Sequence, residues 1–280
     1  MIGSPAARID ALLRPEIRAL SAYHVPPAAG LLKLDAMENP YPWPGELEDE
    51  WLAGLRGVEL NRYPLPHPAE LAQALARQAG VPPGCGLLLG NGSDELIQLI
   101  DICLARPGAS VLLPTPTFSM YRHIAASLGW RVEEVPLTPS FQLDEAQLLQ
   151  RAASCSPRLS VFASPNNPTG NLFDRGAMAR YLRAASGIVV IDEAYHDFAG
   201  ASVVDALPGH PNLVVLQTLS KIGLAALRLG ILLADPRVVM ELEKVRLPYN
   251  VGSFSQAAAR TVLENPVFLQ GQIRMILRER

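Results

Sequence analysis

The chain has 280 residues, 49% of them hydrophobic, and a formal net charge of −3 at pH 7. This is enough apolar material for one large domain and a smaller one, and no basic run indicates a nucleic-acid or membrane surface. The first ten residues carry no apolar segment of a signal peptide, and the longest apolar stretch, near 222–234, is interrupted by Arg228. Three widely spaced cysteines, Cys85, Cys103 and Cys155, form no CxxC pair. We therefore expect a cytoplasmic protein with reduced thiols that neither spans a membrane nor binds nucleic acid.

The hydrophobic pattern predicts an irregular arm followed by alternating helices and strands. Residues 1–48 contain many prolines, and a helix is expected to begin at Pro68 and to end at Gly80. The elements expected after it are, in chain order, a strand at 87–89, a helix to about 104, a strand at 110–113, a helix at 118–128, a strand at 132–137, a helix at 144–153, and strands at 159–163, 187–191, 213–217 and 230–234. Continuous apolar strands separated by helices are typical of a mostly parallel sheet covered on both faces. We therefore expect an α/β fold with three α/β/α layers.

Polar side chains follow three of the apolar strands at the points where the strands end. They are Ser220, Lys221 and Arg228 after the strand at 213–217, Asp192 and Tyr195 after the strand at 187–191, and Asn167 after the strand at 159–163. In open α/β sheets, functional groups gather beyond the carboxyl ends of the strands. We therefore expect these side chains to share one site, and the set suits pyridoxal 5′-phosphate (PLP) held as a Schiff base.

Each residue type in this set has a use in PLP chemistry. PLP acts as an electron sink when its pyridine nitrogen keeps a proton, and Asp192 is the candidate that would hold that proton. Lys221 would form the Schiff base and shuttle a proton, which requires the lowered pKa that burial and nearby cations supply. Asn167 and Tyr195 can donate hydrogen bonds to the ring hydroxyl oxygen.

A second group of residues is suited to hold the cofactor phosphate and ring. A glycine-containing turn follows the first expected strand, and Ser93 or Asp94 then begins a helix whose free amides and dipole favour a phosphate. Arg228 and Ser220 can also bind the phosphate, the arginine through a charge-assisted fork. Phe118 begins another helix and could stack on the pyridine ring.

Taken singly, these residues also have ordinary structural explanations. Lys221 and Arg228 could be solvated cations, Asp192 a helix cap, Phe118 a core residue and Tyr63 part of a packed turn. The five histidines are scattered without the spacing of metal ligands, so we expect no metal site. One loop with two prolines, two asparagines and a glycine follows a buried strand, and together with the order of all the motifs it favours the PLP interpretation.

Seven segments of the chain resemble those of known enzymes. The segments at 164–170 (SPNNPTG), 192–195 (DEAY) and 218–221 (TLSK) resemble the signature segments of the fold-type I PLP-dependent aminotransferases. The segments at 20–25, 34–41, 61–64 and 90–95 resemble, more narrowly, the histidinol-phosphate aminotransferases. The resemblance covers essentially the whole chain, and its motifs are more specific for the cofactor than for the substrate.

The resemblance implies a role for each residue of the expected site. Lys221 matches the Schiff-base lysine, Asp192 the partner of the pyridine nitrogen, Asn167 and Tyr195 the ring-oxygen donors, Phe118 the stacking aromatic, and Ser93, Asp94, Ser220 and Arg228 the phosphate cup. Tyr63 resembles a tyrosine that reaches the cofactor phosphate of the other subunit, which implies a homodimer, and Tyr23 resembles an arm residue that closes over the substrate.

The implied reaction transfers an amino group between histidinol phosphate and 2-oxoglutarate, giving imidazole-acetol phosphate and glutamate in histidine biosynthesis. Three alternatives stay open: an aromatic or other amino-acid aminotransferase, a PLP-dependent decarboxylase acting on an amino-acid phosphate, and an inactive truncated remnant.

Two features depart from the family pattern. The stretch between Lys221 and Arg228 is one residue shorter than in many members, and the sequence stops inside an apparent helix at 273–280. Members of the family continue through most of a small domain, which carries arginines that hold the anionic end of the substrate. We therefore expect a C-terminally incomplete sequence, with an arm and part of the small domain at 1–48, a PLP-binding large domain at 49–250 and the start of the C-terminal small domain at 251–280.

Overall fold

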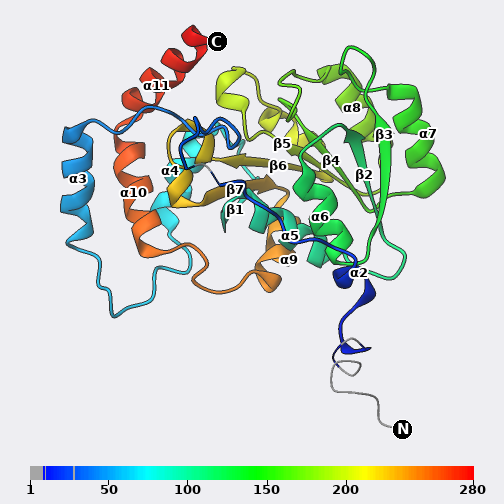
Figure 1. Cartoon of the computed structure of the whole chain (residues 1–280), viewed down its shortest axis with the longest axis horizontal. Coiled ribbons are helices and arrows are strands. Elements are labelled where there is room, and N and C mark those ends of the chain that lie inside the picture. The colour runs from blue at the N-terminus through cyan, green and yellow to red at the C-terminus, as the bar shows by residue number, and fades with distance from the viewer. Residues whose placement is uncertain (1–8, 10, 28) are drawn as a thin grey trace.

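The computed structural model describes residues 9, 11–27 and 29–280, and one seven-stranded sheet lies at the centre of this part of the chain (Figure 1). Its strands are β1 (Gly86–Asn91), β2 (Ser110–Thr115), β3 (Arg131–Pro136), β4 (Leu159–Ala163), β5 (Ile188–Asp192), β6 (Leu213–Thr218) and β7 (Leu229–Ala234). They are ordered β1-β7-β6-β5-β4-β2-β3, and only β7 runs antiparallel to its neighbours, β1 and β6. The mostly parallel α/β fold expected from the sequence is confirmed.

The central strands are mostly apolar because both faces of the sheet are covered. Every residue of β4, β6 and β7 is buried, and alternate side chains of β6 enter different cores. Leu213 and Val215 pack on one face, whereas Val214 and Leu216 pack on the other. The edge strand β3 is more exposed and carries two adjacent glutamates.

Helices form a layer on each face of the sheet. One face is covered by α5 (Ser93–Leu104), α6 (Ser119–Ser127) and α9 (Pro236–Val245). The other face is covered by α4 (Ala69–Gln78), α7 (Glu145–Cys155), α8 (Arg175–Ala184), α10 (Ser253–Glu264) and α11 (Pro266–Glu279). Short 3₁₀ turns are η1 (His196–Phe198), η2 (Val204–Gly209), η3 (Ser220–Ile222) and η4 (Ala225–Leu227).

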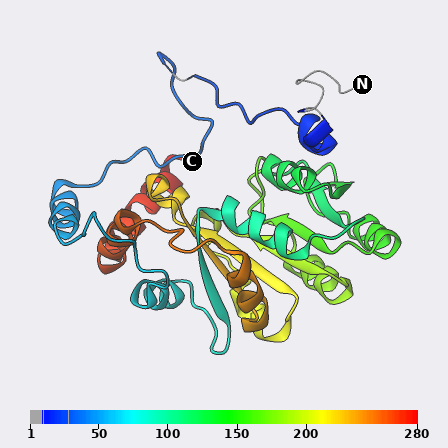
Figure 2. The ribbon, with the colours of Figure 1, turned by 90° about the horizontal axis from the view of Figure 1, so that it is seen from below.

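The N-terminal arm is less irregular than the sequence suggested. It contains a short helix α2 (Pro15–Arg18), and helix α3 (Gly45–Leu55) begins before residue 48. The prolines of this region end at Pro44, which is the N-cap of α3, and Glu46 and Glu48 then favour the helix through its dipole. Figure 2 shows the arm passing from α2, which contacts α6, to α3, which packs on α10. The domain boundaries expected at 48/49 and 250/251 stay a prediction.

No helix in the described part of the chain is long and apolar enough to cross a membrane.

Candidate functional site

The expected site residues lie at the carboxyl ends of three neighbouring parallel strands. Ala163 at the end of β4 pairs with Asp192 at the end of β5, and Asp192 pairs with Leu216 of β6. The strand ends are therefore almost level, and the segments that follow them leave the sheet at the same edge. Lys221 follows in the 3₁₀ turn η3. This register is the reason that Asn167, Asp192 and Lys221, far apart in the sequence, belong to one site.

Asp192 is a buried carboxyl group held by two hydrogen bonds. Its Oδ2 accepts from the Tyr121 hydroxyl at 2.7 Å, and its Oδ1 accepts from the backbone N–H of Ala194 at 3.0 Å. Burial raises the pKa of Asp192 to about 6, while these two hydrogen bonds oppose the rise. Among the ion pairs formed by the described residues, none involves Asp192. A cationic group in direct contact with this carboxylate would supply the ion pair that it does not form with the other described residues.

Glu193, next to Asp192, faces away from the site and fixes the turn. Its carboxylate accepts from the backbone N–H of Val203 at 2.6 Å, from the Ser202 hydroxyl at 2.7 Å and from the Gln217 amide at 3.0 Å. The segment that carries Asp192 is therefore anchored in two directions. Glu193 was not among the residues predicted to form the site, although two consecutive acids at a buried strand end indicate that at least one must find several hydrogen-bond donors.

Lys221 is a half-buried amine in contact with the N-terminal arm. Its Nζ donates to the backbone carbonyl of Ala36 at 3.1 Å and lies 5.3 Å from the centre of the Tyr195 ring. Burial lowers the pKa of Lys221, and the Arg228 cation acts in the same direction, while Asp94 and Asp192 oppose them. A lysine with a lowered pKa carries more of the neutral amine, which is the nucleophilic form.

Tyr195 and Asn167 lie beside each other, and the loop that carries Asn167 is held by its neighbour. Burial raises the pKa of Tyr195, Asp192 adds to this, and the Asn167 amide acts in the opposite direction. Asn166 is buried, and its amide donates to Pro116 O at 3.0 Å and to Thr169 Oγ1 at 2.8 Å. The first asparagine of the pair therefore shapes the loop and leaves the second facing Tyr195.

The glycine turn between β1 and α5 lies against Arg228. Gly92 is the N-cap of α5 with φ of 83°, and a Cβ atom there would lie 2.6 Å from Arg228 Nη2. Arg228 Nη2 lies 3.5 Å from Asp94 Oδ2, and Arg228 has left-handed backbone with φ of 50°. Ser93 is the first residue of the helix. A helix N-terminus beside an arginine is a site for an anion such as a phosphate.

The remaining predicted residues divide into two groups. Ser220 is buried, with its Oγ 3.0 Å from Thr218 Oγ1, and Phe118 makes an edge-to-face contact with Tyr121, which bonds Asp192. Tyr23 and Tyr63 are exposed instead, and Tyr63 stacks on Tyr249 with ring centres 4.6 Å apart. The structure therefore brings Phe118 close to the strand-end residues, while the two tyrosines lie on the surface of this chain.

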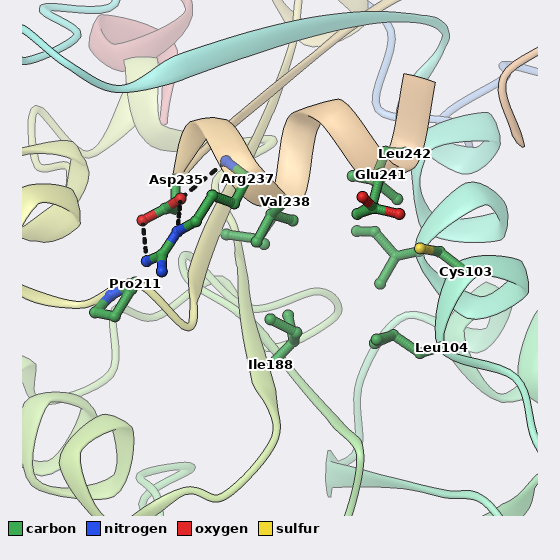
Figure 3. A pocket seen from close by; sticks show the side chains of 11 residues that line it. Cys103, Leu104, Ile188, Pro211, Asp235, Arg237, Val238, Glu241 and Leu242 are labelled. Atoms are coloured by element: carbon green, nitrogen blue, oxygen red, sulfur yellow. Dashed lines mark hydrogen bonds and ion pairs between the residues drawn. The ribbon is translucent and has the colours of Figure 1, made fainter. Parts of the chain in front are cut away.

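A different cavity of about 310 Å³ lies near the amino-terminal ends of β5 and β6, between α5 and α9 (Figure 3). Its walls are mainly apolar. Three charged residues, Asp235, Arg237 and Glu241, also line it, and Asp235 and Arg237 bind each other at 2.8 Å. None of the predicted site residues lines it. In the described part of the chain, no group of three or more histidine, cysteine or acidic side chains is arranged to hold a metal ion.

Comparison with known proteins gives a consistent result. Residues 30–279 match the family described as aminotransferase class I and II. Histidinol-phosphate aminotransferase 2 of Nitrosococcus oceani is 48% identical over 273 residues, which are 98% of this chain and 76% of the relative. Histidinol-phosphate aminotransferase 1 of Ralstonia nicotianae is 46% identical over 274 residues, which are 96% of this chain and 73% of the relative.

A similar fold is found in the crystal structure of histidinol-phosphate aminotransferase from Sinorhizobium meliloti in complex with pyridoxal-5′-phosphate. The TM-score is 0.82 at 24% sequence identity, and the match covers 93% of this chain and 73% of that chain. The chain thus spans about three quarters of the length of the proteins it matches.

Proposed function

Because the chain belongs to the class I and II aminotransferase family, we propose that it is a PLP-dependent histidinol-phosphate transaminase. The reaction would exchange L-histidinol phosphate and 2-oxoglutarate for imidazole-acetol phosphate and L-glutamate, in L-histidine biosynthesis. The observation that carries the proposal is the half-buried Lys221, with its lowered pKa, at the same sheet edge as the buried Asp192. The choice of substrate rests on the relatives, which are 46–48% identical and are named for it.

The donor set fits PLP at each of its polar ends. Asp192 is a buried carboxyl group that forms no ion pair with any other described residue, which suits a protonated ring nitrogen. The N-terminus of α5 and Arg228 suit the phosphate, and Lys221 suits the aldehyde. When bound, PLP supplies an electron sink for the pair of electrons released at the substrate carbon.

Each residue around the cofactor ring would have its own role in the reaction. Lys221 binds the cofactor aldehyde and afterwards moves a proton to or from the substrate carbon, which its lowered pKa supports. Asp192 holds a proton at the ring nitrogen, and Tyr121 keeps the carboxylate oriented. Tyr195 and Asn167 donate hydrogen bonds to the ring oxygen.

Two further groups would hold the cofactor in place. Phe118 covers the ring, and its contact with Tyr121 supports that position. The phosphate would be held by Ser220, by Arg228 and by Ser93 and Asp94, the latter two through the free N–H groups at the N-terminus of α5. The cofactor would thus be fixed at its ring and its phosphate, while the aldehyde end stays open to the substrate.

The enzyme would act as a homodimer whose two sites each use residues of both chains. Tyr63 is 80% exposed and is presented by its stacking on Tyr249, which supports a role in the phosphate site of a second subunit. Tyr23, also exposed, would close over the substrate from the arm.

Mixing the Tyr63→Phe variant with the Lys221→Ala variant tests whether the two subunits share their sites. Heterodimers would contain one intact site, so the mixture should exceed the mean activity of the parents. Strictly monomeric elution with full PLP occupancy would contradict it.

The substrate is tested by supplying PLP, 2-oxoglutarate and L-histidinol phosphate and measuring glutamate, with Lys221→Ala as the control. Glutamate formed from phenylalanine but not from histidinol phosphate would indicate an aromatic aminotransferase. Carbon dioxide released from an amino-acid phosphate would indicate a decarboxylase, and PLP binding without any turnover would indicate an inactive remnant.

The three free cysteines support a location in the reducing cytoplasm.

A further inference from the structure

The segment that follows α9 is bonded to the glycine turn of the phosphate site. Asn250 lies in this segment, and its amide nitrogen donates to Glu95 Oε2 at 2.7 Å and to the backbone carbonyl of Leu89 at 3.2 Å. Leu89 belongs to β1 and Glu95 to α5, so one side chain bridges the two elements that the turn connects. Asn250 is far from the turn in sequence and was not singled out by any motif.

Glu95 carries the contact from Asn250 into the turn itself. Its Oε2 also accepts the backbone N–H of Asn91 at 2.5 Å. The glutamate at the third position of a helix often reaches back in this way to bond a free N–H before the first turn. The N-cap of α5 is Gly92, which has no side chain to cap the helix, so the position of the turn depends on Glu95.

Asn250 is itself held by Arg246, the C-cap residue of α9. Its Oδ1 accepts from Arg246 Nη1 at 2.6 Å. The Arg246 side chain is only 6% exposed and forms an ion pair with Glu243 at 2.8 Å. The arginine therefore has a charge partner of its own and fixes the amide of Asn250 with its nitrogen pointing at Glu95. Both polar atoms of the Asn250 side chain are hydrogen-bonded. A flip that exchanged the amide oxygen and nitrogen would place the nitrogen against Arg246 and the oxygen against Glu95, so these bonds would be lost.

We propose that Asn250 is a positioning residue for the cofactor phosphate. It holds Glu95, and through Glu95 the backbone of the turn, so that the N-terminus of α5 faces the same point as Arg228. This rests on the proposed function, since it takes PLP as the anion. Loss of Asn250 should weaken binding through the phosphate while leaving the reactivity of Lys221 unchanged.

The test compares PLP with pyridoxal, which has the aldehyde but no phosphate. In Asn250→Ala the dissociation constant for PLP, measured by absorbance titration, should rise at least tenfold, while that for pyridoxal changes less than twofold. Asn250→Asp places a second carboxylate against Glu95 and should have a larger effect. Asn212→Ala is the matched control, because Asn212 is also a half-buried asparagine but donates to Leu182 O and Gly187 O rather than to the turn.

The outcomes are distinct. Equal weakening of PLP and pyridoxal would make Asn250 a general structural residue and overturn the proposal, as would unchanged PLP binding. Unfolding midpoints identify a variant that fails to fold, and Asn250→Ser then provides a smaller perturbation with the same expected direction. A wild-type chain that binds PLP but does not transaminate histidinol phosphate would overturn the proposed substrate and leave the role of Asn250 standing.

Discussion

Strand β7 lies directly against the glycine turn at Gly230, and an alanine at this position should separate the two. A Cβ atom on Gly230 would lie 2.5 Å from Gly92 C, 2.6 Å from Ser93 N and 2.7 Å from Gly92 O. All three are backbone atoms, so no side chain can rotate away. The substitution therefore acts on the main chain of the turn and of the strand.

The size of the effect follows from these distances. Ordinary contact begins near 3.4 Å, so the turn and the strand must move apart by about 0.9 Å. Gly230 pairs with Gly90 on one side and with Thr218 on the other, which opposes such a movement. Insertion of a methyl group into a packed interior typically costs about 1–3 kcal/mol. We expect Gly230→Ala to lower the free energy of unfolding by about 2 kcal/mol and to weaken PLP binding.

Urea unfolding and PLP titration of the purified variant measure both effects. Gly271→Ala is the control, since Gly271 lies within α11 with no atom near the added methyl group. That change should stabilise the protein by up to about 1 kcal/mol, because alanine is the better helix former. If Gly230→Ala unfolded at the same urea concentration as the wild type with the same slope, the turn would be able to move, and the reasoning would be refuted.

Three further predictions concern single side chains. Borohydride reduction of the PLP-loaded protein should leave pyridoxyl on Lys221 in peptide maps, and label on another lysine would contradict its role. Asp192→Ala should reduce turnover far more than Asp192→Glu, because only a carboxylate holds the ring-nitrogen proton; equal losses would make Asp192 structural. Burial raises the pKa of Asp101 from 3.8 to about 7, so the folded state keeps its proton longer than the unfolded state. Relative to Asp101→Asn, wild-type stability should therefore fall between about pH 4 and pH 7, by about 1.4 kcal/mol per unit of the shift; parallel stability curves in urea would refute this.

The strands were predictable because burial on both faces leaves an unmistakable pattern. The observed β4 covers the residues expected for it, and the other central strands differ by a residue or so at their ends. The direction of β7 was not predicted, although the chain held a signal. Only ten residues separate β6 from β7, and a parallel crossover usually needs a dozen or more, with a helix. Short connections of this kind indicate an antiparallel neighbour.

The residues at the strand ends could be predicted from the sequence, whereas the residues that hydrogen-bond to them could not. Asp192 is the last residue of β5 and Lys221 lies in the turn just after β6, so their positions follow from the topology of the sheet. The contacts to Ala36, Tyr121 and Asn250 depend on how distant segments pack. A backbone carbonyl such as that of Ala36 carries no sequence signature at all, so only the folded chain reveals it.

The connection between β6 and β7 carries Lys221 and Arg228 on one short piece of chain. Two 3₁₀ turns shape this piece, and left-handed residues end both of them, Gly223 with φ of 110° and Arg228 with φ of 50°. Because the strands at both ends are fully buried, the connection cannot stretch without disturbing the sheet. The connection therefore fixes the distance between the Lys221 amine and the Arg228 guanidinium. A residue inserted into this connection would shift Arg228 relative to Lys221, and a ligand that contacts both groups would then be bound less tightly.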